Sequence, residues 1–346
     1  MSNQVAVGIV GASGYSGAEL LRLLLAHPDV AVKVITSRQY ANQRLDSVFP
    51  NLRGVTTLSF SDPQDAPLTE CDVVFFATPH GVCMREAAAL IECGVRIIDF
   101  SGDFRLRDPN VFTRWYDMEH TAQDLLKEAV YGLPETHRAA IAKARLVANP
   151  GCYPTAVHLG VKPLLEADAL FSDDIIADVK SGVSGAGRGA KQDNLAAEIE
   201  GNFKLYAASG HRHQPEIEQE LSLLASREVH CTFVPHLVPM VRGIEATLYL
   251  SLRDPSLDVH ALFTRAYVDE PFVDVLPEGA HTQTRYVRGT NFVHISVHRS
   301  VNRRTAIISV VEDNLIKGAA GQAVQSMNIM FGLAETSGLM QPAQIP

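Results

Sequence analysis

Cys152 lies in the segment NPGCYPTA (residues 149–156), where a turn leads into an apolar helical pattern. Pro150 and Gly151 predict the turn, and Pro154 is typical of the first turn of a helix. A cysteine at this junction faces unpaired backbone N–H groups and the positive end of a helix dipole, which favour the thiolate. Because the thiolate is the nucleophilic form of cysteine, the segment predicts a catalytic thiol.

A cysteine nucleophile needs a partner that moves protons, and residues 210–216 supply two candidates. His211 and His213 flank Arg212, just before a helical pattern whose Pro215 and Glu216 suit a first turn. Histidine titrates near neutral pH, so either ring can donate and accept protons during turnover. The spacing leaves the choice between the two histidines open, and we favour His213.

A glycine-rich turn near the N-terminus predicts a nucleotide site. Gly8, Gly11, Gly14 and Gly17 repeat every three residues between a strand pattern and a helix pattern. Glycines at such a turn let backbone N–H groups approach a pyrophosphate at the helix N-terminus. The predicted cofactor residues from this turn and from the carboxyl edge of the sheet are Gly11, Ser13, Gly14, Tyr15, Ser16, Gly17, Ser37, Arg38, Thr78 and Pro79.

The end of the second predicted strand indicates which dinucleotide binds. An NAD site usually has an acidic residue there, which holds the ribose hydroxyls. This chain has Thr36, Ser37 and Arg38 instead. A hydroxyl and a guanidinium suit a 2′-phosphate, so we predict NADP(H) as the cofactor.

Arginine side chains are candidates for binding phosphate or carboxylate groups of a substrate, because the planar guanidinium holds two oxygens at once. The predicted substrate residues are Arg105, Asn149, Arg212 and Arg242. A second glycine-rich stretch, residues 181–188, would let its backbone approach a nicotinamide or a substrate phosphate. Within it we select Ser181, Gly182, Ser184 and Gly185.

A cysteine nucleophile combined with NADP narrows the chemistry. The thiol attacks an activated acyl group such as an acyl phosphate, and phosphate leaves. The thioester then takes a hydride from NADPH, and the resulting thiohemiacetal collapses to an aldehyde. General acid–base help from a histidine contributes about 10²–10⁴-fold in such steps.

Length and composition limit the class of protein. The chain has 346 residues, of which 46% are hydrophobic, enough for two domains. Its formal net charge is −9 and no basic block is present, so nucleic acid is not an expected partner. The absence of a long apolar run and of a signal-peptide pattern argues against membrane insertion and favours the cytoplasm. The five cysteines show no zinc-type spacing, so we expect free thiols and no metal.

The hydrophobic pattern predicts an α/β fold. Apolar strands alternate with helices in the first part of the chain, which indicates a Rossmann-type doubly wound parallel sheet. These strands are expected at 5–10, 30–36, 73–77, 96–100 and 146–148, with helices at 18–26 and 84–93. Later strands, at 175–179, 231–234, 246–252, 292–298 and 305–311, predict a second α+β domain with a mixed or antiparallel sheet.

The domain organisation follows from this pattern. A helix over 314–333 is expected to pack back on the first domain. We therefore predict an NADP-binding domain at 1–151 and 313–346. A catalytic, substrate-binding and oligomerisation domain is predicted at 152–312.

Several segments together resemble the N-acetyl-γ-glutamyl-phosphate reductase family. The similarity runs through the cysteine motif, the nucleotide turn GASGYSGAEL, and the segments 99–105, 181–188, 211–216, 239–243 and 313–322. It extends over nearly the whole chain, and neither the cysteine motif nor the glycine turn departs from the family pattern.

The resemblance implies an enzyme of arginine biosynthesis. It would reduce N-acetyl-γ-glutamyl phosphate to N-acetylglutamate semialdehyde with NADPH and release inorganic phosphate. It implies Cys152 as the nucleophile, one histidine of the 211–213 segment as acid/base, and Asn314 with the 181–188 loop near the cofactor. The family is similar in fold to aspartate-semialdehyde dehydrogenases and usually forms homodimers or homotetramers.

Two alternatives remain open at this point. A sibling reductase would act on aspartyl phosphate or on a carrier-linked aminoadipyl phosphate with the same chemistry. A non-catalytic NADP sensor would keep the fold but is expected to lose the cysteine or the histidines, all of which are present.

Overall fold

The computed structural model describes residues 4–345, which form two compact units. The first unit runs to Pro150 and resumes over Ala319–Met340. The second unit comprises Gly151–Gly318 and the residues from Gln341 on. Residues 313–318 thus belong to the second unit, whereas the sequence pattern groups them with the nucleotide-binding domain.

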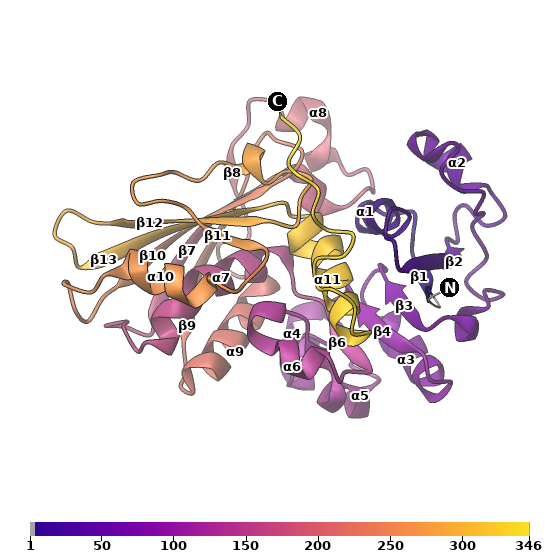
Figure 1. Ribbon diagram of the computed structural model, residues 1–346, viewed down its shortest axis with the longest axis horizontal. Coiled ribbons are helices and arrows are strands. Elements are labelled where there is room, and N and C mark those ends of the chain that lie inside the picture. The colour runs from indigo at the N-terminus through magenta and orange to yellow at the C-terminus, as the bar shows by residue number, and fades with distance from the viewer. Residues whose placement is uncertain (1–3, 346) are drawn as a thin grey trace. The chain divides into compact units, whose positions relative to one another are not determined.

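The first unit is built on a six-stranded parallel sheet, which confirms the predicted doubly wound class (Figure 1). Its strand order is β2-β1-β3-β4-β6-β5. The sheet is apolar on both faces, as parallel sheets covered by helices are. The strands are β1 (Val5–Val10), β2 (Val30–Thr36), β3 (Val73–Phe76), β4 (Arg96–Asp99), β5 (Val130–Tyr131) and β6 (Leu146–Ala148).

Seven α-helices accompany this sheet in the described part of the unit. They are α1 (Tyr15–Leu24), α2 (Leu45–Val48), α3 (Cys83–Glu92), α4 (Pro109–Tyr116), α5 (Gln123–Glu128), α6 (Pro134–Ile141) and α11 (Gly321–Met330). The helix α11, although it comes last in the chain, packs against α1 and α6. The short elements β5, α4, α5 and α6 were not predicted from the sequence.

The predicted helix over 314–333 is wrong in its first part. A π-helical turn, Ile316–Ala320, precedes α11, and α11 ends at Met330. The backbone carbonyl of Asp313 accepts hydrogen bonds from the N–H groups of Ile316 and Gly318, 3.1 Å in each case. The second bond spans five residues, as in a π-helix, so the entry to α11 departs from the regular α-helical period that the sequence pattern assumes.

The second unit contains a seven-stranded mixed sheet, as predicted. Its order is β11-β12-β13-β10-β7-β9-β8, with parallel pairs β11–β12 and β7–β9 and antiparallel pairs elsewhere. The strands are β7 (Asp174–Ser181), β8 (Lys204–Leu205), β9 (His230–Leu237), β10 (Ile244–Ser251), β11 (Val273–Val275), β12 (Val293–Arg299) and β13 (Thr305–Glu312).

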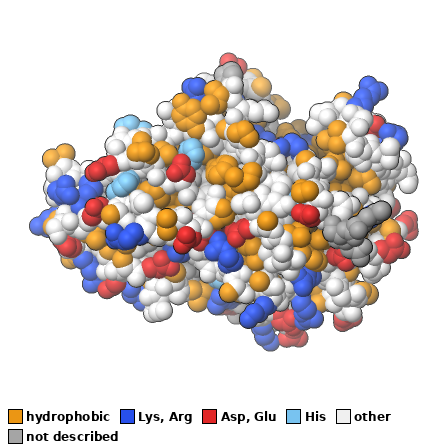
Figure 2. Space-filling view, viewed as in Figure 1, with side chains coloured by type: hydrophobic (Ala, Val, Ile, Leu, Met, Phe, Trp, Pro, Cys, Tyr) orange, Lys and Arg blue, Asp and Glu red, His pale blue; other side chains and the backbone are white. Residues whose placement is uncertain are grey.

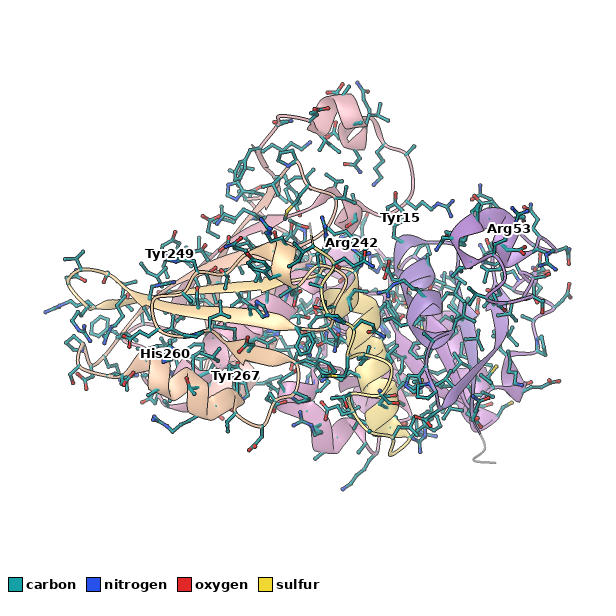
Figure 3. All side chains as sticks on the ribbon, turned by 45° about the horizontal axis from the view of Figure 1, so that its top comes forward. Tyr15, Arg53, Arg242, Tyr249, His260 and Tyr267 are labelled. Atoms are coloured by element: carbon teal, nitrogen blue, oxygen red, sulfur yellow. The ribbon has the colours of Figure 1, made fainter. Side chains whose placement is uncertain are left out.

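Four α-helices belong to the described part of the second unit: α7 (Cys152–Glu166), α8 (Ala196–Ile199), α9 (His213–Ala225) and α10 (Val259–Tyr267). The helix α7 packs on β10, β13, α9 and α10, and its residues are almost all buried. The hydroxyl of Tyr267, labelled in Figure 3, donates to the backbone carbonyl of Leu159 and so ties α10 to α7. Burial on this scale fixes α7, and with it the position of Cys152 at its first residue.

No helix in the described residues is long and apolar enough to span a membrane. Figure 2 shows acidic and basic side chains interspersed over the visible face. That distribution agrees with the lack of a basic block in the sequence.

Candidate active site

The glycine turn of the first unit joins β1 to α1. Gly11 has φ +84°, and a β-carbon there would lie 2.5 Å from the carbonyl oxygen of Ala77. A β-carbon at Gly17 would lie 2.7 Å from Ala12 Cα, so both positions exclude larger residues. Gly14 is different, because the nearest atom to its added β-carbon is the Gly11 carbonyl oxygen at 3.8 Å. The turn is therefore closely packed at Gly11 and Gly17 and open at Gly14. Gly14 lies next to the N-terminus of α1, where an anion is favoured.

Two hydroxyl groups beside this turn make no hydrogen bond within the described residues. Thr78 Oγ1 and Thr36 Oγ1 are both buried, and Thr78 Cγ2 lies 3.2 Å from the Gly11 β-carbon position. Ser13 Oγ lies 3.0 Å from Ser37 Oγ, which links the turn to the residue after β2. Unsatisfied buried hydroxyls are uncommon in folded proteins, and they fit a site that a polar ligand completes.

A cavity of about 700 Å³ lies beside the end of β2. Arg38 lines it together with Arg85 and Glu86 from α3, and the apolar residues Leu68 and Leu90 line it too. Burial raises the pKa of the Glu86 carboxyl, while the guanidinium groups of Arg38 and Arg85 oppose that rise. Arg38 and Arg85 thus both act on Glu86 at the cavity wall. Arg85 is a candidate cofactor-binding residue that no sequence pattern indicated.

Cys152 differs from the other four cysteines in its position and in its surroundings. It is the first residue of α7 and is half-buried. Burial raises the pKa of the Cys83 and Cys231 thiols, and that of Cys71 to about 11, which makes these three poor nucleophiles. Cys93 is exposed at the end of α3.

His213 lies beside the turn that carries Cys152. A β-carbon at Gly151 would come within 2.5 Å of His213 Nε2, so the ring touches the residue that precedes the thiol. The N–H of Gly151 donates to Glu216 Oε1 at 2.7 Å, and Glu216 is fully buried. His213 begins α9, and Glu216 lies three residues on, the spacing that puts two side chains on one helix face. Glu216 is a candidate site residue that this spacing could have revealed.

His211 has a different environment from His213. Its ring packs against Tyr153, Tyr206 and Phe233 at centroid distances of 5.6, 5.8 and 5.4 Å. Burial, with a contribution from the charge of Arg212, lowers the pKa of His211 to about 4. Its Nδ1 accepts the backbone N–H of His213 at 3.0 Å. His211 is therefore neutral near pH 7 and holds His213 in place.

Two tyrosines complete the surroundings of the thiol. The hydroxyl oxygens of Tyr153 and Tyr206 lie 2.6 Å apart. Burial raises the pKa of both, that of Tyr206 to about 12, and the nearby charge of a Cys152 thiolate adds to the rise. Tyr206 follows the two-residue strand β8, and no motif in the sequence marked it.

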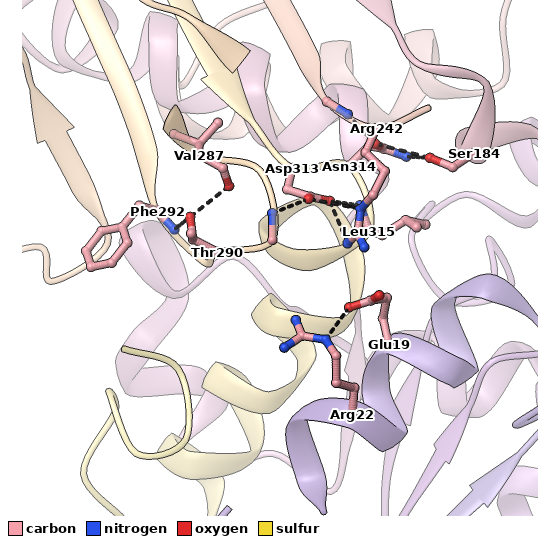
Figure 4. Close-up of polar contacts among 12 residues, drawn as sticks. Glu19, Arg22, Ser184, Arg242, Val287, Thr290, Phe292, Asp313, Asn314 and Leu315 are labelled. Atoms are coloured by element: carbon pink, nitrogen blue, oxygen red, sulfur yellow. Dashed lines mark hydrogen bonds and ion pairs between the residues drawn. The ribbon is translucent and has the colours of Figure 1, made fainter. Parts of the chain in front are cut away.

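The predicted glycine-rich loop, the Arg242 segment and Asn314 meet in one hydrogen-bonded cluster of the second unit (Figure 4). Asn314 Nδ2 donates to Ser184 Oγ at 3.0 Å, and Asn314 Oδ1 accepts the N–H of Gly243 at 2.8 Å. Asp313 pairs with the Arg242 guanidinium at 3.1 Å.

The loop backbone is locked to the same segment. Gly182 donates its N–H to the carbonyl of Gly243 at 2.9 Å, and its added β-carbon would lie 2.8 Å from the Val241 carbonyl group. A glycine is thus required at 182, and Gly185 keeps an open flank, with its nearest neighbours at 3.5 Å or more. Ser181 Oγ donates to the carbonyl of Gly182 at 3.0 Å.

The other predicted substrate residues are distributed differently. Arg105 and Asn149 lie together in the first unit, where Arg105 Nε donates to the Asn149 carbonyl at 2.8 Å and Arg105 Nη2 to the Phe100 carbonyl at 2.6 Å. Arg212 is exposed just before α9 in the second unit. No group of three or more potential metal ligands occurs among the residues that the structure describes.

Two family models match the chain. One, described as semialdehyde dehydrogenase, NAD binding domain, matches residues 6–144. The other, described as semialdehyde dehydrogenase, dimerisation domain, matches residues 152–314. The boundary between the two matches falls next to the cysteine turn.

Curated relatives are similar over the full length. The chain is 56% identical to the N-acetyl-gamma-glutamyl-phosphate reductase of Nitrosomonas europaea, over 98% of this chain and 99% of that protein. It is 55% identical to the protein of the same name from Thiobacillus denitrificans, over 99% and 100% of the two chains.

Solved structures of aspartate semialdehyde dehydrogenases share the fold. The Vibrio cholerae enzyme II, complexed with ASA, aligns with a TM-score of 0.75 at 19% identity, over 96% of this chain and 99% of that one. The Candida albicans enzyme with NADP aligns with a TM-score of 0.71 at 15% identity, over 95% and 98%.

Proposed function

The chain belongs to the family of N-acetyl-γ-glutamyl-phosphate reductases, and from this premise we propose which of its residues perform the reaction. The enzyme reduces N-acetyl-γ-glutamyl phosphate to N-acetylglutamate semialdehyde with NADPH and releases phosphate, a step of arginine biosynthesis. The observation that carries the proposal is the position of His213 Nε2 against Gly151, the residue before Cys152.

In the first step, Cys152 Sγ attacks the γ-carbonyl carbon of the substrate. The C–S bond forms, the bond from carbon to the phosphate oxygen breaks, and the thiol proton passes to His213. Phosphate leaves and takes up one proton from solvent. The N-terminus of α7 favours negative charge on sulfur during the attack, because Cys152 is its first residue.

In the second step, the protonated His213 ring donates to the oxygen that becomes negative as the thioester is reduced. Bound NADPH supplies the hydride. His213 then removes the same proton as the C–S bond breaks and the aldehyde leaves. His211 does not take this role, because its pKa of about 4 keeps it unprotonated near neutral pH.

Residues of the first unit are proposed to hold the adenosine and pyrophosphate parts of NADP. The open flank of Gly14 and the N-terminus of α1 suit the pyrophosphate. The unsatisfied hydroxyl of Thr78 lies beside the turn. Arg38 and Arg85, which both line the cavity, suit the 2′-phosphate and the adenine ring.

For the nicotinamide and the substrate we keep the remaining predicted residues as candidates. The loop residues Ser181, Gly182, Ser184 and Gly185, with Asn314, are proposed for the nicotinamide end or a substrate phosphate. Asn314 acts by holding the loop through Ser184. Arg105, Asn149, Arg212 and Arg242 are proposed to bind substrate.

We further propose that the enzyme works in the cytoplasm as a homodimer or homotetramer. The match of residues 152–314 to a dimerisation domain supports an oligomer. None of the five cysteines, all within the described residues, forms a disulfide, as expected of a reducing compartment. Sedimentation equilibrium of the purified chain decides between the oligomeric states.

The reaction run in reverse tests the substrate assignment, since acyl phosphates are labile. NADP, inorganic phosphate and N-acetylglutamate semialdehyde are supplied, and NADPH absorbance is followed, with aspartate semialdehyde as the comparison. We expect a phosphate-dependent rise with the acetylated aldehyde alone. A rise with another semialdehyde only would reassign the enzyme to a sibling reductase. No rise with either aldehyde, despite NADPH binding, would indicate the sensor.

A further inference from the structure

The carboxyl group of Glu216 lies at the cysteine turn, and the proposed reaction does not use it. Glu216 belongs to α9, the helix that packs against α7. Its side chain is fully buried. A buried carboxyl group costs free energy unless hydrogen bonds replace those that it made with water. The N–H of Gly151 supplies one such bond, because it donates to Glu216 Oε1 at 2.7 Å.

This hydrogen bond caps the N-terminus of α7. Gly151 is the N-cap residue of that helix and has no side chain that could cap it. In a capping box, a Glu or Gln three residues further along the same helix accepts the N–H of the N-cap residue. The corresponding residue of α7 is Pro154, which has no acceptor in its side chain. Glu216 thus accepts from a second helix the N–H that a capping residue usually accepts within its own helix.

The same face of α9 holds Gly151 at a second point. His213 lies three residues before Glu216, so the two side chains share a face of the helix. The His213 ring fills the place of a side chain at Gly151, with Nε2 2.5 Å from the β-carbon position. Within α7, the Gly151 carbonyl accepts the N–H and the hydroxyl of Thr155, at 3.1 Å each. Both backbone polar groups of Gly151 are therefore held, one by each helix.

We propose that Glu216 is a positioning residue that sets the distance between His213 and Cys152. Its hydrogen bond joins the residue before the nucleophile to the helix that begins with the acid/base residue. Without that bond the turn and the His213 ring can separate, and proton transfer slows because it depends on hydrogen-bond reach. A displacement of about 1 Å can cost about 10²-fold in rate. This inference rests on the proposed roles of Cys152 and His213.

Two substitutions separate the reach of the side chain from its charge. Glu216→Gln keeps the length and an acceptor oxygen, whereas Glu216→Asp keeps a carboxyl group but is shorter by one methylene. In the reverse assay we expect Glu216→Asp to lower kcat by about 10²-fold and Glu216→Gln to lower it by less than about tenfold. The KM values for NADP and the semialdehyde should change little. Wild-type kcat in Glu216→Asp, or a Gln variant no more active than the Asp variant, would overturn the inference.

A double-mutant cycle shows whether Glu216 acts through His213. In the His213→Gln background the acid/base group is already missing, so we expect Glu216→Asp to cost less than about threefold in kcat. A loss as large as in the wild-type background would overturn the inference, because a residue that only stabilises the fold gives additive effects. If Glu216→Asp does not fold, Glu216→Met, which has a similar length and only a weak acceptor, replaces it with the same expectation.

Glu220→Asp is the matched control. Glu220 is also buried on α9, one turn after Glu216, so the same shortening is made in the same helix. We expect wild-type kcat in Glu220→Asp. A loss of kcat equal to that of Glu216→Asp would show that any shortened carboxylate on α9 disturbs turnover, and it would overturn the inference.

The turnover of two further variants distinguishes this inference from the proposed function. Full turnover by Cys152→Ser or by His213→Gln would refute the proposed mechanism, and the role of Glu216 with it. If both variants are impaired while Glu216→Asp keeps wild-type kcat, the role of Glu216 alone is refuted.

Discussion

The imidazole of His213 occupies the space that a side chain at Gly151 would need. All three ring atoms nearest to that position, Nε2, Cδ2 and Cε1, lie within 2.9 Å of it. Gly151 itself has φ −67° and ψ 152°, a conformation that any residue can adopt. The glycine is therefore required by the approach of His213 to the cysteine turn and not by the backbone.

Gly151→Ala follows directly from this contact. The added methyl displaces the His213 ring, so we expect kcat to fall by about 10²-fold or more, as when a general acid–base catalyst is lost. Backbone strain is absent, so the thermal unfolding midpoint should change little. Gly189→Ala is the matched control, because nothing lies within 4 Å of its added β-carbon. Normal turnover in Gly151→Ala would contradict the role of His213.

Cys152→Ser removes the nucleophile and leaves the nucleotide turn untouched. We expect normal NADPH binding, measured by fluorescence titration, and almost no turnover in the reverse assay. Cys93→Ser, at an exposed position at the end of α3, should retain wild-type activity. Retained turnover in Cys152→Ser would disprove the thioester route.

Replacement of His213 and replacement of His211 should change the pH–rate profile in different ways. With a pKa of about 4, His211 is neutral above about pH 5, so it adds no ionisation near neutrality. We expect His213→Gln to lower kcat by about 10²–10⁴-fold and to remove the limb due to the acid/base group. His211→Gln should reduce kcat while the shape of the profile near pH 7 is kept. The reverse pattern would assign the acid/base role to His211.

Much of this architecture could be predicted from local signals. The glycine turn, the cysteine motif and the alternation of apolar strands are short-range patterns. The strand patterns predicted the parallel sheet and the mixed sheet correctly in kind, and the role of the thiol stays a prediction. Tyr206 could not be found this way. Its hydroxyl meets that of Tyr153, which lies 53 residues earlier in the chain, and no neighbour in sequence marks it.

The arginines show a second limit of sequence analysis, because a residue type does not reveal its partners in the fold. The residue type alone suggested that Arg105 and Arg242 bind substrate, but it could not show their protein partners. Arg105 donates to two backbone carbonyls, and Arg242 pairs with Asp313. Arg85 carried no signal because only the packing of α3 beside the end of β2 places it on the cavity with Arg38.

Arg38 and Arg85 are expected to set the preference for NADP over NAD. Hydrogen bonds from charged groups contribute about 1.5–3 kcal/mol each, so Arg38→Ala should weaken NADPH binding by about tenfold or more. Arg85→Ala should weaken it too, and NADH binding should change little in both variants. Fluorescence titration of each cofactor measures the ratio. Arg53→Ala, an exposed arginine labelled in Figure 3 that does not line the cavity, is the control. Equal losses for NADPH and NADH would place the 2′-phosphate elsewhere.

His27 should make the first unit sensitive to acid. Burial lowers the pKa of His27 below its usual 6.5, although the hydrogen bond with Asn328 opposes this change. Its Nδ1 accepts the N–H of Asp29 at 3.2 Å, and Nε2 lies 3.0 Å from Asn328 Oδ1. The folded state thus holds the neutral ring with its proton on Nε2.

The sign of the effect follows from proton binding. Below about pH 6.5 the unfolded chain binds a proton at His27 that the folded chain binds less readily, so stability falls as the pH drops. It continues to fall until the pH passes the lowered pKa of the folded state. We expect the urea midpoint of wild type to decrease more between about pH 7.5 and about pH 5.5 than that of His27→Gln, which has no titrating ring. Each tenfold weakening of proton binding at His27 on folding costs at most about 1.4 kcal/mol of stability in acid. Parallel decreases in the two proteins would show that His27 is not the group that destabilises the first unit in acid.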